Sequence, residues 1–261
     1  MSLPPHGYQP FAPGLLRPEW HLPPGVHAMV STREGGASLA PWASFNLGSH
    51  VGDDARAVAA NRARLCAATG AEPVWLEQVH GCAVADADCT AGVPAADAAV
   101  ARATGRACAV MTADCLPVLF CDADASVVAA AHAGWRGLAA GVLERTVERM
   151  GVAPGRVRAW LGPAIGPAAF EVGDEVRAAF VGADPGAAAA FVPGVAPGKW
   201  LADLFMLARR RLVAAGVGRI DGGGVCTVAD PGHFYSYRRD GTTGRFASLI
   251  WLEEGRRGGI T

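Results

Sequence analysis

Residues 97–137 read DAAVARATGRACAVMTADCLPVLFCDADASVVAAAHAGWRG, and this stretch decides the fold class. Four short apolar runs follow one another in it: DAAVA, ACAVMT, LPVLFC and SVVAAA. Runs of this length and composition are typical of buried β-strands. The few residues between them leave no room for the crossover helices that parallel neighbours need. We therefore expect an α/β fold with a mixed β-sheet flanked by helices.

Outward from this stretch, strands alternate with helices along the chain. We expect further strands at residues 26–31, 157–162, 225–230 and 246–252, and a hairpin of residues 74–79 and 82–86 that turns at His80 and Gly81. We expect helices at residues 137–150, 174–181 and 200–215, and one that begins at Asp53 or Asp54 and ends near Gly70. No linker divides the chain, so residues 26–261 are predicted to form one catalytic domain and residues 1–25 an N-terminal extension.

The composition excludes several classes of protein. Of the 261 residues, 51% are hydrophobic and 18% charged, which is a globular composition. The net charge of −1 offers no cationic field to nucleic acid or to an anionic membrane, and no run approaches the ~20 apolar residues of a membrane span. We expect a cytoplasmic protein with neither partner, whose oligomeric state the sequence leaves open. The seven cysteines form no CxxC pair, so the sequence predicts neither a disulfide framework nor a zinc knuckle.

Three polar residues follow apolar runs and are candidates for a metal site. His80 follows VWLEQV, Cys115 follows ACAVMTAD, and His132 follows SVVAAA. Side chains at the ends of different strands can meet at the rim of a sheet. Two imidazoles and a thiolate suit Zn²⁺ and leave its fourth tetrahedral position open for water or substrate. Taken singly, each residue also fits a structural role, as a buried histidine or a core cysteine.

The turn AHAGWRG at residues 131–137 is a candidate anion site. Gly134 and Gly137 mark a sharp turn from strand to helix, whose backbone N–H groups favour an anion, and Arg136 lies beside them. The alternative is a solvated arginine at the start of a helix.

The loop GHFYSYRRDGTTGR at residues 232–245 is a candidate substrate-binding segment. Tyr235 and Tyr237 could stack on a planar ring, and Arg238, Arg239 and Arg245 could pair with phosphate or carboxylate. A protein interface would use the same residue types. Asn46 and Arg62 are further polar candidates for substrate binding.

Eight motifs occur in an order that resembles the bacterial laccase-domain family. They are STREGGAS, SFNLGSHVGDD, EQVHG, MTADCLPVLF, AAHAGWRG, LGPAIGP, FEVGDEV and FYSYRRDGTTGR, and the resemblance covers residues 26–252. Members of this YfiH-like family have been called polyphenol oxidases, peptidoglycan-editing factors and zinc-dependent purine nucleoside phosphorylases. The resemblance implies a fold similar to the catalytic domain of cytotoxic necrotizing factor. It also implies zinc ligands at His80, Cys115 and His132.

The resemblance further implies phosphorolysis of adenosine, inosine, guanosine and methylthioadenosine, with adenosine deamination as a possible second activity. For phosphorolysis, our hypothesis is that Arg136 and Arg62 bind phosphate and that zinc acts as a Lewis acid. For deamination, Asp114 is the candidate proton shuttle. Seven histidines with no His-x-His pair cannot populate several copper sites, so any copper oxidase activity would come from adventitious copper in the zinc position.

Two alternatives from other classes stay open. A metal-free cysteine hydrolase would use Cys115 as nucleophile and a histidine as base, acting on peptidoglycan precursors. A non-catalytic binding module would use the loop at residues 232–245. Stoichiometric zinc would argue against the hydrolase, and turnover of a nucleoside would argue against the binding module.

Overall fold

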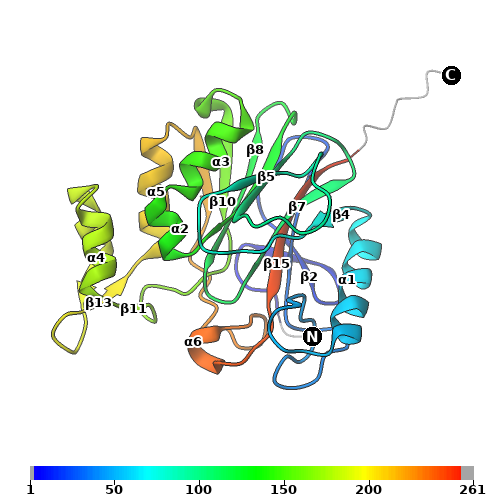
Figure 1. The fold of residues 1–261 in the computed structure, drawn as a ribbon, viewed down its shortest axis with the longest axis horizontal. Coiled ribbons are helices and arrows are strands. Elements are labelled where there is room, and N and C mark those ends of the chain that lie inside the picture. The colour runs from blue at the N-terminus through cyan, green and yellow to red at the C-terminus, as the bar shows by residue number, and fades with distance from the viewer. Residues whose placement is uncertain (1–2, 254–261) are drawn as a thin grey trace.

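The structure is a computed structural model that describes residues 3–253, and two six-stranded sheets form its centre (Figure 1). The first sheet has the order β1 (Tyr8–Ala12), β2 (Leu15–Pro18), β3 (Val26–Ser31), β15 (Phe246–Leu252), β7 (Arg106–Thr112) and β4 (Glu72–Val74). The second sheet has the order β14 (Arg219–Gly222), β10 (Val157–Leu161), β8 (Leu116–Asp122), β9 (Val128–Ala133), β6 (Ala98–Ala101) and β5 (Val84–Asp86). A smaller sheet contains β11 (Glu171–Gly173), β13 (Lys199–Ala202) and β12 (Phe191–Pro193).

Both large sheets are mixed, which confirms the predicted α/β class. The pairs β4–β7, β10–β14 and β5–β6 are parallel, and the other pairs in these two sheets are antiparallel. The strands form two large sheets rather than the single sheet expected. Of the four consecutive strands that decided the fold class, β7 joins the first sheet and β6, β8 and β9 join the second. The reason is distant pairing, because β7 bonds along its length to β15 from the far end of the chain.

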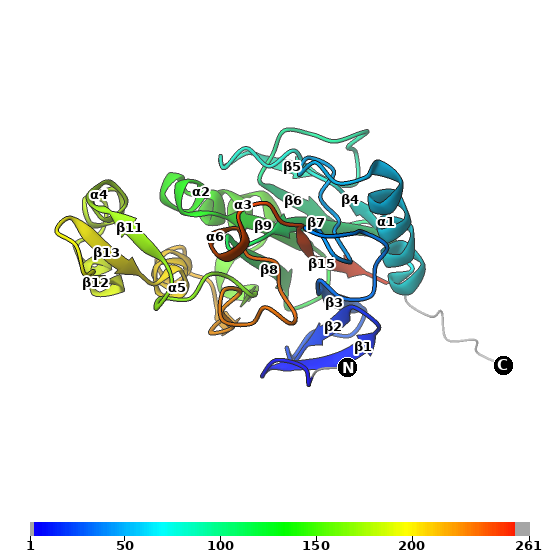
Figure 2. The ribbon, with the colours of Figure 1, turned by 90° about the horizontal axis from the view of Figure 1, so that it is seen from below.

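The helices are α1 (Ala55–Thr69), α2 (Trp135–Ala140), α3 (Val142–Met150), α4 (Asp174–Val181), α5 (Leu204–Ala214) and α6 (Tyr237–Asp240), with 3-10 turns at Pro154–Arg156 and Pro185–Ala190. Helices α1, α2, α3 and α5 cover the outer faces of the two large sheets, α4 packs on the smaller sheet, and α6 lies at one end of the large sheets (Figure 1). Leu65 of α1 packs on the first sheet, and Leu143 of α3 and Leu212 of α5 pack on the second. A third apolar layer, with Val110 and Leu119, fills the space between the sheets. Figure 2 shows the resulting order of helix, sheet, sheet and helices.

Several predicted elements need correction. The hairpin of residues 74–86 is wrong, because β4 pairs with β7 and β5 with β6, in different sheets. The helix expected over residues 200–215 begins only at Leu204, where Asp203 accepts a hydrogen bond from the Met206 N–H, and the residues before it form β13. The helix expected over residues 137–150 is interrupted at Gly141, whose φ is 98°. No strand forms at residues 225–230, where Cys226 makes an isolated bridge to Ala164.

Other predicted elements agree with the structure. α1 runs from its cap at Asp54 to Gly70, and α4 has the predicted bounds. The segment predicted as an N-terminal extension adds β1 and β2 to the first sheet beside β3, while the last eight residues of the predicted domain lie outside the described part. No helix within residues 3–253 is long and apolar enough to cross a membrane.

Candidate metal centre

Three donor side chains from distant parts of the chain meet at one point beside the second sheet. His80 lies in the segment between β4 and β5, Cys115 in the turn between β7 and β8, and His132 in β9 opposite Pro117 of β8. Their ligand atoms all lie within 4.8 Å of one another. The Cys115 Sγ is 3.8 Å from the His80 Nε2, and the two imidazole centroids are 4.8 Å apart. The three residues predicted as ligands are therefore brought together.

One buried carboxylate organises two of these three donors. Asp97, fully buried just before β6, accepts hydrogen bonds from the backbone N–H groups of His80 (2.9 Å) and Gly81 (2.7 Å) and, more distantly, Val79 (3.2 Å). These bonds hold the turn in which His80 adopts a φ of 61°. Asp97 also lies 2.8 Å from the His132 Nδ1. Burial disfavours its ionisation, but the bonds from His132 and Gly81 outweigh burial and hold the pKa of Asp97 below its ordinary value.

The bond to Asp97 fixes which nitrogen of His132 faces the other donors. An ionised carboxylate only accepts hydrogen bonds, so the His132 Nδ1 is the donor. The Nε2 is then left free to coordinate a metal. A carboxylate behind a ligating histidine is a common arrangement in metal sites, because it orients the ring and raises its basicity.

Glycine is required where helix α2 begins next to the donors. A Cβ built on Gly134 would lie 2.9 Å from the His80 Cδ2 and 3.0 Å from the Cys115 Sγ. A Cβ on Gly137 would lie 2.8 Å from the Gly81 carbonyl oxygen. Both glycines of the turn predicted to bind an anion thus permit close approach of the His80 segment.

The electrostatics favour a thiolate at the centre. Burial disfavours the charged sulfur, but His132 and His80 outweigh burial and lower the pKa of Cys115 to about 6. Burial likewise opposes charge on His132, and the Cys115 thiolate and Asp97 outweigh it and raise the pKa of that imidazole. The thiolate is the form of cysteine that binds metals.

The donor set fits a borderline-soft ion such as Zn²⁺. Three protein ligands, one of them sulfur, leave one tetrahedral position for a reactant, which is the pattern of catalytic zinc sites. Copper would accept the same donors. Among residues 3–253 this is the one group of three or more histidine, cysteine or acidic side chains placed to hold a metal, so these residues do not provide the several sites of a multicopper oxidase.

A cavity of about 540 Å³ opens beside the three donors, and we call it the metal-site cavity. Four of the predicted substrate-binding residues, Arg136, Tyr237, Arg238 and Arg245, line it, as does Asp114. The guanidinium of Arg136 lies over the Trp135 ring, 4.5 Å from its centroid. That of Arg238 donates to the carbonyl oxygens of residues 169 and 171.

The carboxylate of Asp114 is engaged on both oxygens. Its Oδ1 accepts a 2.6 Å hydrogen bond from the Thr227 hydroxyl, and its Oδ2 accepts a 2.7 Å hydrogen bond from the backbone N–H of Arg238. These bonds join the turn after β7 to the start of α6. The candidate proton shuttle is thus also a structural link in the cavity wall.

The other predicted substrate-binding residues, Asn46, Arg62, Tyr235 and Arg239, do not line this cavity. Asn46 is buried and bonds to Gly48 and Asp53. Arg62 donates to the Leu47 carbonyl oxygen and stacks on the ring of Trp75.

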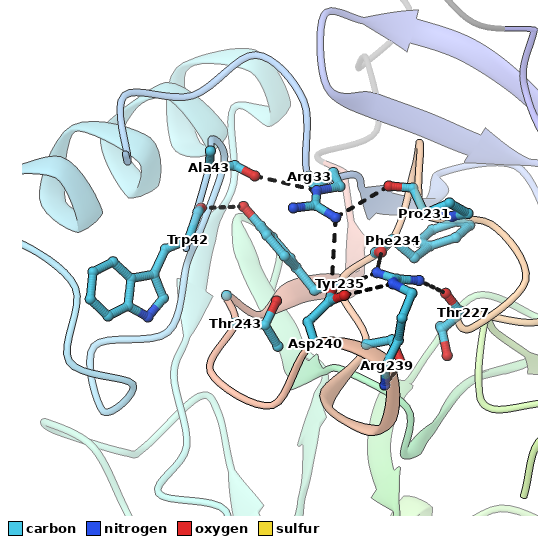
Figure 3. Close-up of polar contacts among 12 residues, drawn as sticks. Arg33, Trp42, Ala43, Thr227, Pro231, Phe234, Tyr235, Arg239, Asp240 and Thr243 are labelled. Carbon is cyan, nitrogen blue, oxygen red and sulfur yellow. Dashed lines mark hydrogen bonds and ion pairs between the residues drawn. The ribbon is translucent and has the colours of Figure 1, made fainter. Parts of the chain in front are cut away.

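Tyr235 is fully buried, and its hydroxyl donates a 2.7 Å bond to the Trp42 carbonyl oxygen (Figure 3). Arg33 stacks on the Tyr235 ring and donates to the carbonyl oxygens of residues 43 and 231, while Arg239 donates to those of residues 227, 228 and 234. These contacts anchor the loop that carries the cavity residues Tyr237, Arg238 and Arg245.

Several residues of the site were not predicted from the sequence. Besides Asp97 they are Gln78 and His50, which both line the metal-site cavity. Gln78 is held by two 2.8 Å bonds to the backbone of Met111. One sequence signal pointed to Asp97: an aspartate stands at the start of the apolar run DAAVA, where a buried carboxylate needs hydrogen-bond partners.

Comparisons with known proteins find relatives along nearly the whole chain. Residues 27–253 match the family described as multi-copper polyphenol oxidoreductase laccase. Purine nucleoside phosphorylase PA4543 of Pseudomonas aeruginosa is 57% identical over 239 residues, which cover 92% of this chain and 98% of that protein. Purine nucleoside phosphorylase YfiH of Escherichia coli is 54% identical over 244 residues, covering 91% and 98%.

Solved structures also resemble this chain over most of its length. Protein NMB0706 of Neisseria meningitidis superimposes with a TM-score of 0.90 at 51% identity, over 92% of this chain and 99% of that one. YlmD of Geobacillus stearothermophilus gives 0.89 at 35% identity, over 96% and 100%.

Proposed function

Because the chain belongs to the multi-copper polyphenol oxidoreductase laccase family, and because two relatives more than half identical to it are named purine nucleoside phosphorylases, we propose that it is a zinc-dependent purine nucleoside phosphorylase. Its substrates are inorganic phosphate and adenosine, inosine, guanosine or methylthioadenosine. A phosphate oxygen attacks the ribose C1′ as the bond from C1′ to the purine nitrogen breaks. The electron pair of that bond leaves with the base, and the sugar is released as its 1-phosphate.

His80, Cys115 and His132 would hold the zinc. Bound there, the ion would supply Lewis acidity toward an oxygen or nitrogen of the substrate. Asp97 holds the backbone of His80 and the imidazole ring of His132 in place.

The observation that carries the proposal is the charge of the metal-site cavity. Arg136, Arg238 and Arg245 line it, and within residues 3–253 none of them forms an ion pair with a carboxylate. Guanidinium groups without a counter-ion attract phosphate and can hold it in a fixed orientation. Positioning the dianion beside the sugar is the main task of a phosphorylase.

Other parts of the wall of the metal-site cavity are apolar, which suits the purine. Trp135, Phe170 and Leu204 present apolar surface, and Tyr237 adds an exposed aromatic ring. A flat base gains from packing against such surfaces. Asp114 stays our candidate for moving a proton, which requires that it exchange one of its present hydrogen bonds for one to the substrate.

Product analysis tests the proposal. Zinc-loaded protein is incubated with inosine, with and without phosphate, and the products are separated by chromatography. We expect hypoxanthine only when phosphate is present. Cys115→Ala is expected to lose both zinc and turnover, while Cys89→Ala, which removes an exposed thiol, keeps both. Failure of the wild-type protein to form hypoxanthine refutes the function, and wild-type turnover by Cys115→Ala refutes the metal centre.

The same incubation with adenosine in place of inosine separates the other activities. Adenosine deamination yields inosine, whereas phosphorolysis yields adenine, so one chromatogram distinguishes them. The cysteine hydrolase has an observation in its favour, because the two imidazoles beside Cys115 lower the pKa of its thiol to about 6. Metal analysis decides that case: one zinc per chain, with Cys115 protected from alkylation, argues against it.

A further inference from the structure

A second cavity adjoins the metal-site cavity and shares part of its wall. It has a volume of about 330 Å³. His50, Tyr237 and Arg245 line both cavities. We call the second one the adjoining cavity; the rest of its wall is Val51 and residues 241–243. Because the two cavities share these side chains, they lie next to each other.

The wall of the adjoining cavity carries a cation with no acidic partner. Arg245 is half-buried, and its guanidinium donates to the carbonyl oxygens of Thr243 (3.1 Å) and Gly244 (3.0 Å). Within residues 3–253 it forms no ion pair, and burial lowers its pKa. A guanidinium has five donors, so carbonyl bonds from one nitrogen leave donors available for a ligand. Keeping such a group without a counter-ion is costly unless an anion binds there.

A residue with an unpartnered buried hydroxyl contributes to the same wall. Thr243 lines the adjoining cavity, and its buried Oγ1 has no hydrogen-bond partner among the described residues. An unmet buried hydroxyl costs about 1–3 kcal/mol, so such groups are usually met by a ligand or a water. The exposed hydroxyl residue Thr242 and the imidazole of His50 supply further polar groups.

We propose that the adjoining cavity is an anion subsite that takes a phosphoryl group of a reactant bound at the metal centre. Arg245 provides the charge and part of the hydrogen bonding, and Thr243 provides a hydroxyl. This inference rests on the proposed function for the identity of the reactants. The phosphoryl group comes either from inorganic phosphate or from the 5′ position of a nucleotide, since both present the same tetrahedral oxyanion.

Two variants probe the subsite. Thr243→Val removes a hydroxyl that no other described residue uses, so the fold is expected to keep its stability. Arg245→Met removes the charge but keeps most of the stem. Ser248→Ala is the matched control, because Ser248 in β15 also has a buried, unpartnered hydroxyl but lines neither cavity. Thermal unfolding of all three establishes that they are folded.

The measurement is equilibrium binding to the zinc-loaded protein by titration calorimetry, with inorganic phosphate, inosine and inosine 5′-monophosphate as ligands. We expect Arg245→Met to weaken binding of the phosphoryl ligand by about tenfold or more and Thr243→Val by about threefold to tenfold, with no change in Ser248→Ala. If phosphate alone is affected, inorganic phosphate occupies the subsite. If the nucleotide binds more tightly than inosine and loses that advantage in the variants, the 5′-phosphate occupies it.

The proposal is overturned if neither phosphate nor the nucleotide distinguishes the two variants from wild type and Ser248→Ala. Its fate is separate from that of the proposed function, because binding is measured without turnover. Loss of phosphoryl binding in a protein that forms no free base would keep the subsite and refute the phosphorylase.

Discussion

Replacing Asp97 by asparagine tests whether one buried carboxylate assembles the metal centre. Asp97 accepts four hydrogen bonds, three from the backbone of residues 79–81 and one from His132. Asparagine has the same shape, but its amide group has one oxygen and an NH₂ that cannot accept. Whichever way the amide turns, two of the four donors then face another donor.

The magnitude follows from these contacts. Each N–H left without an acceptor costs about 1–3 kcal/mol, so the free energy of unfolding should fall. Loss of a carboxylate behind a ligating histidine typically weakens metal binding by about 10- to 100-fold. That range corresponds to about 1.4–2.8 kcal/mol of zinc-binding free energy. We expect the upper part of the range, because Asp97 supports His80 as well as His132.

The assay is competition for zinc against a chromophoric chelator, with folding followed in parallel by circular dichroism. Asp122→Asn is the matched control: Asp122 is also fully buried and accepts backbone N–H groups, but it is the last residue of β8, at the end of that strand opposite Cys115. It should lose stability without losing zinc affinity. A folded Asp97→Asn protein that binds zinc within twofold of wild type would refute the reasoning.

Three further predictions follow from single contacts. Gly134→Ala should weaken zinc binding because the new Cβ collides with His80; the φ of −59° at this position suits alanine, so the backbone is not strained. Gly155→Ala is the control, because its Cβ meets nothing within 4 Å and zinc affinity should not change. Equal zinc affinities of the two variants in competition titrations would contradict the prediction. Tyr235→Phe should lower the free energy of unfolding by about 1–2 kcal/mol, because the hydroxyl donates a hydrogen bond to the backbone. The KM for nucleoside should not change, because the hydroxyl does not face the metal-site cavity. A raised KM would support the substrate-binding role predicted from the sequence. His50→Gln should gain stability relative to wild type as the pH falls from about 7.5 to 5.5. Partial burial, Arg245 and Arg62 lower the pKa of His50, so near pH 6.5 only the unfolded wild-type chain takes up a proton at this residue, which destabilises the folded wild type. Denaturant unfolding at several pH values measures the difference, and parallel pH profiles for the two proteins would contradict the prediction.

Local patterns carried much of the fold. The apolar runs at residues 98–133 are strands, and α1 ends at its glycine, because side-chain periodicity and capping act over a few residues. Where a segment was decided by distant partners, the prediction failed. Residues 74–86 looked like a hairpin, yet β4 and β5 bond to different strands in different sheets. Hydropathy cannot tell which of several apolar runs a strand will pair with.

For the candidate site too, some features followed from the sequence and others only from the structure. The residue types at His80, Cys115 and His132, together with the ordered motifs around them, identified the donors from the sequence alone. Only the tertiary structure placed their ligand atoms within 4.8 Å, put Asp97 behind them, and turned Tyr235 into the interior while Arg245 lined the cavity. Chemistry is a property of single residues and can be read from the chain, whereas orientation depends on contacts between segments that the sequence keeps far apart.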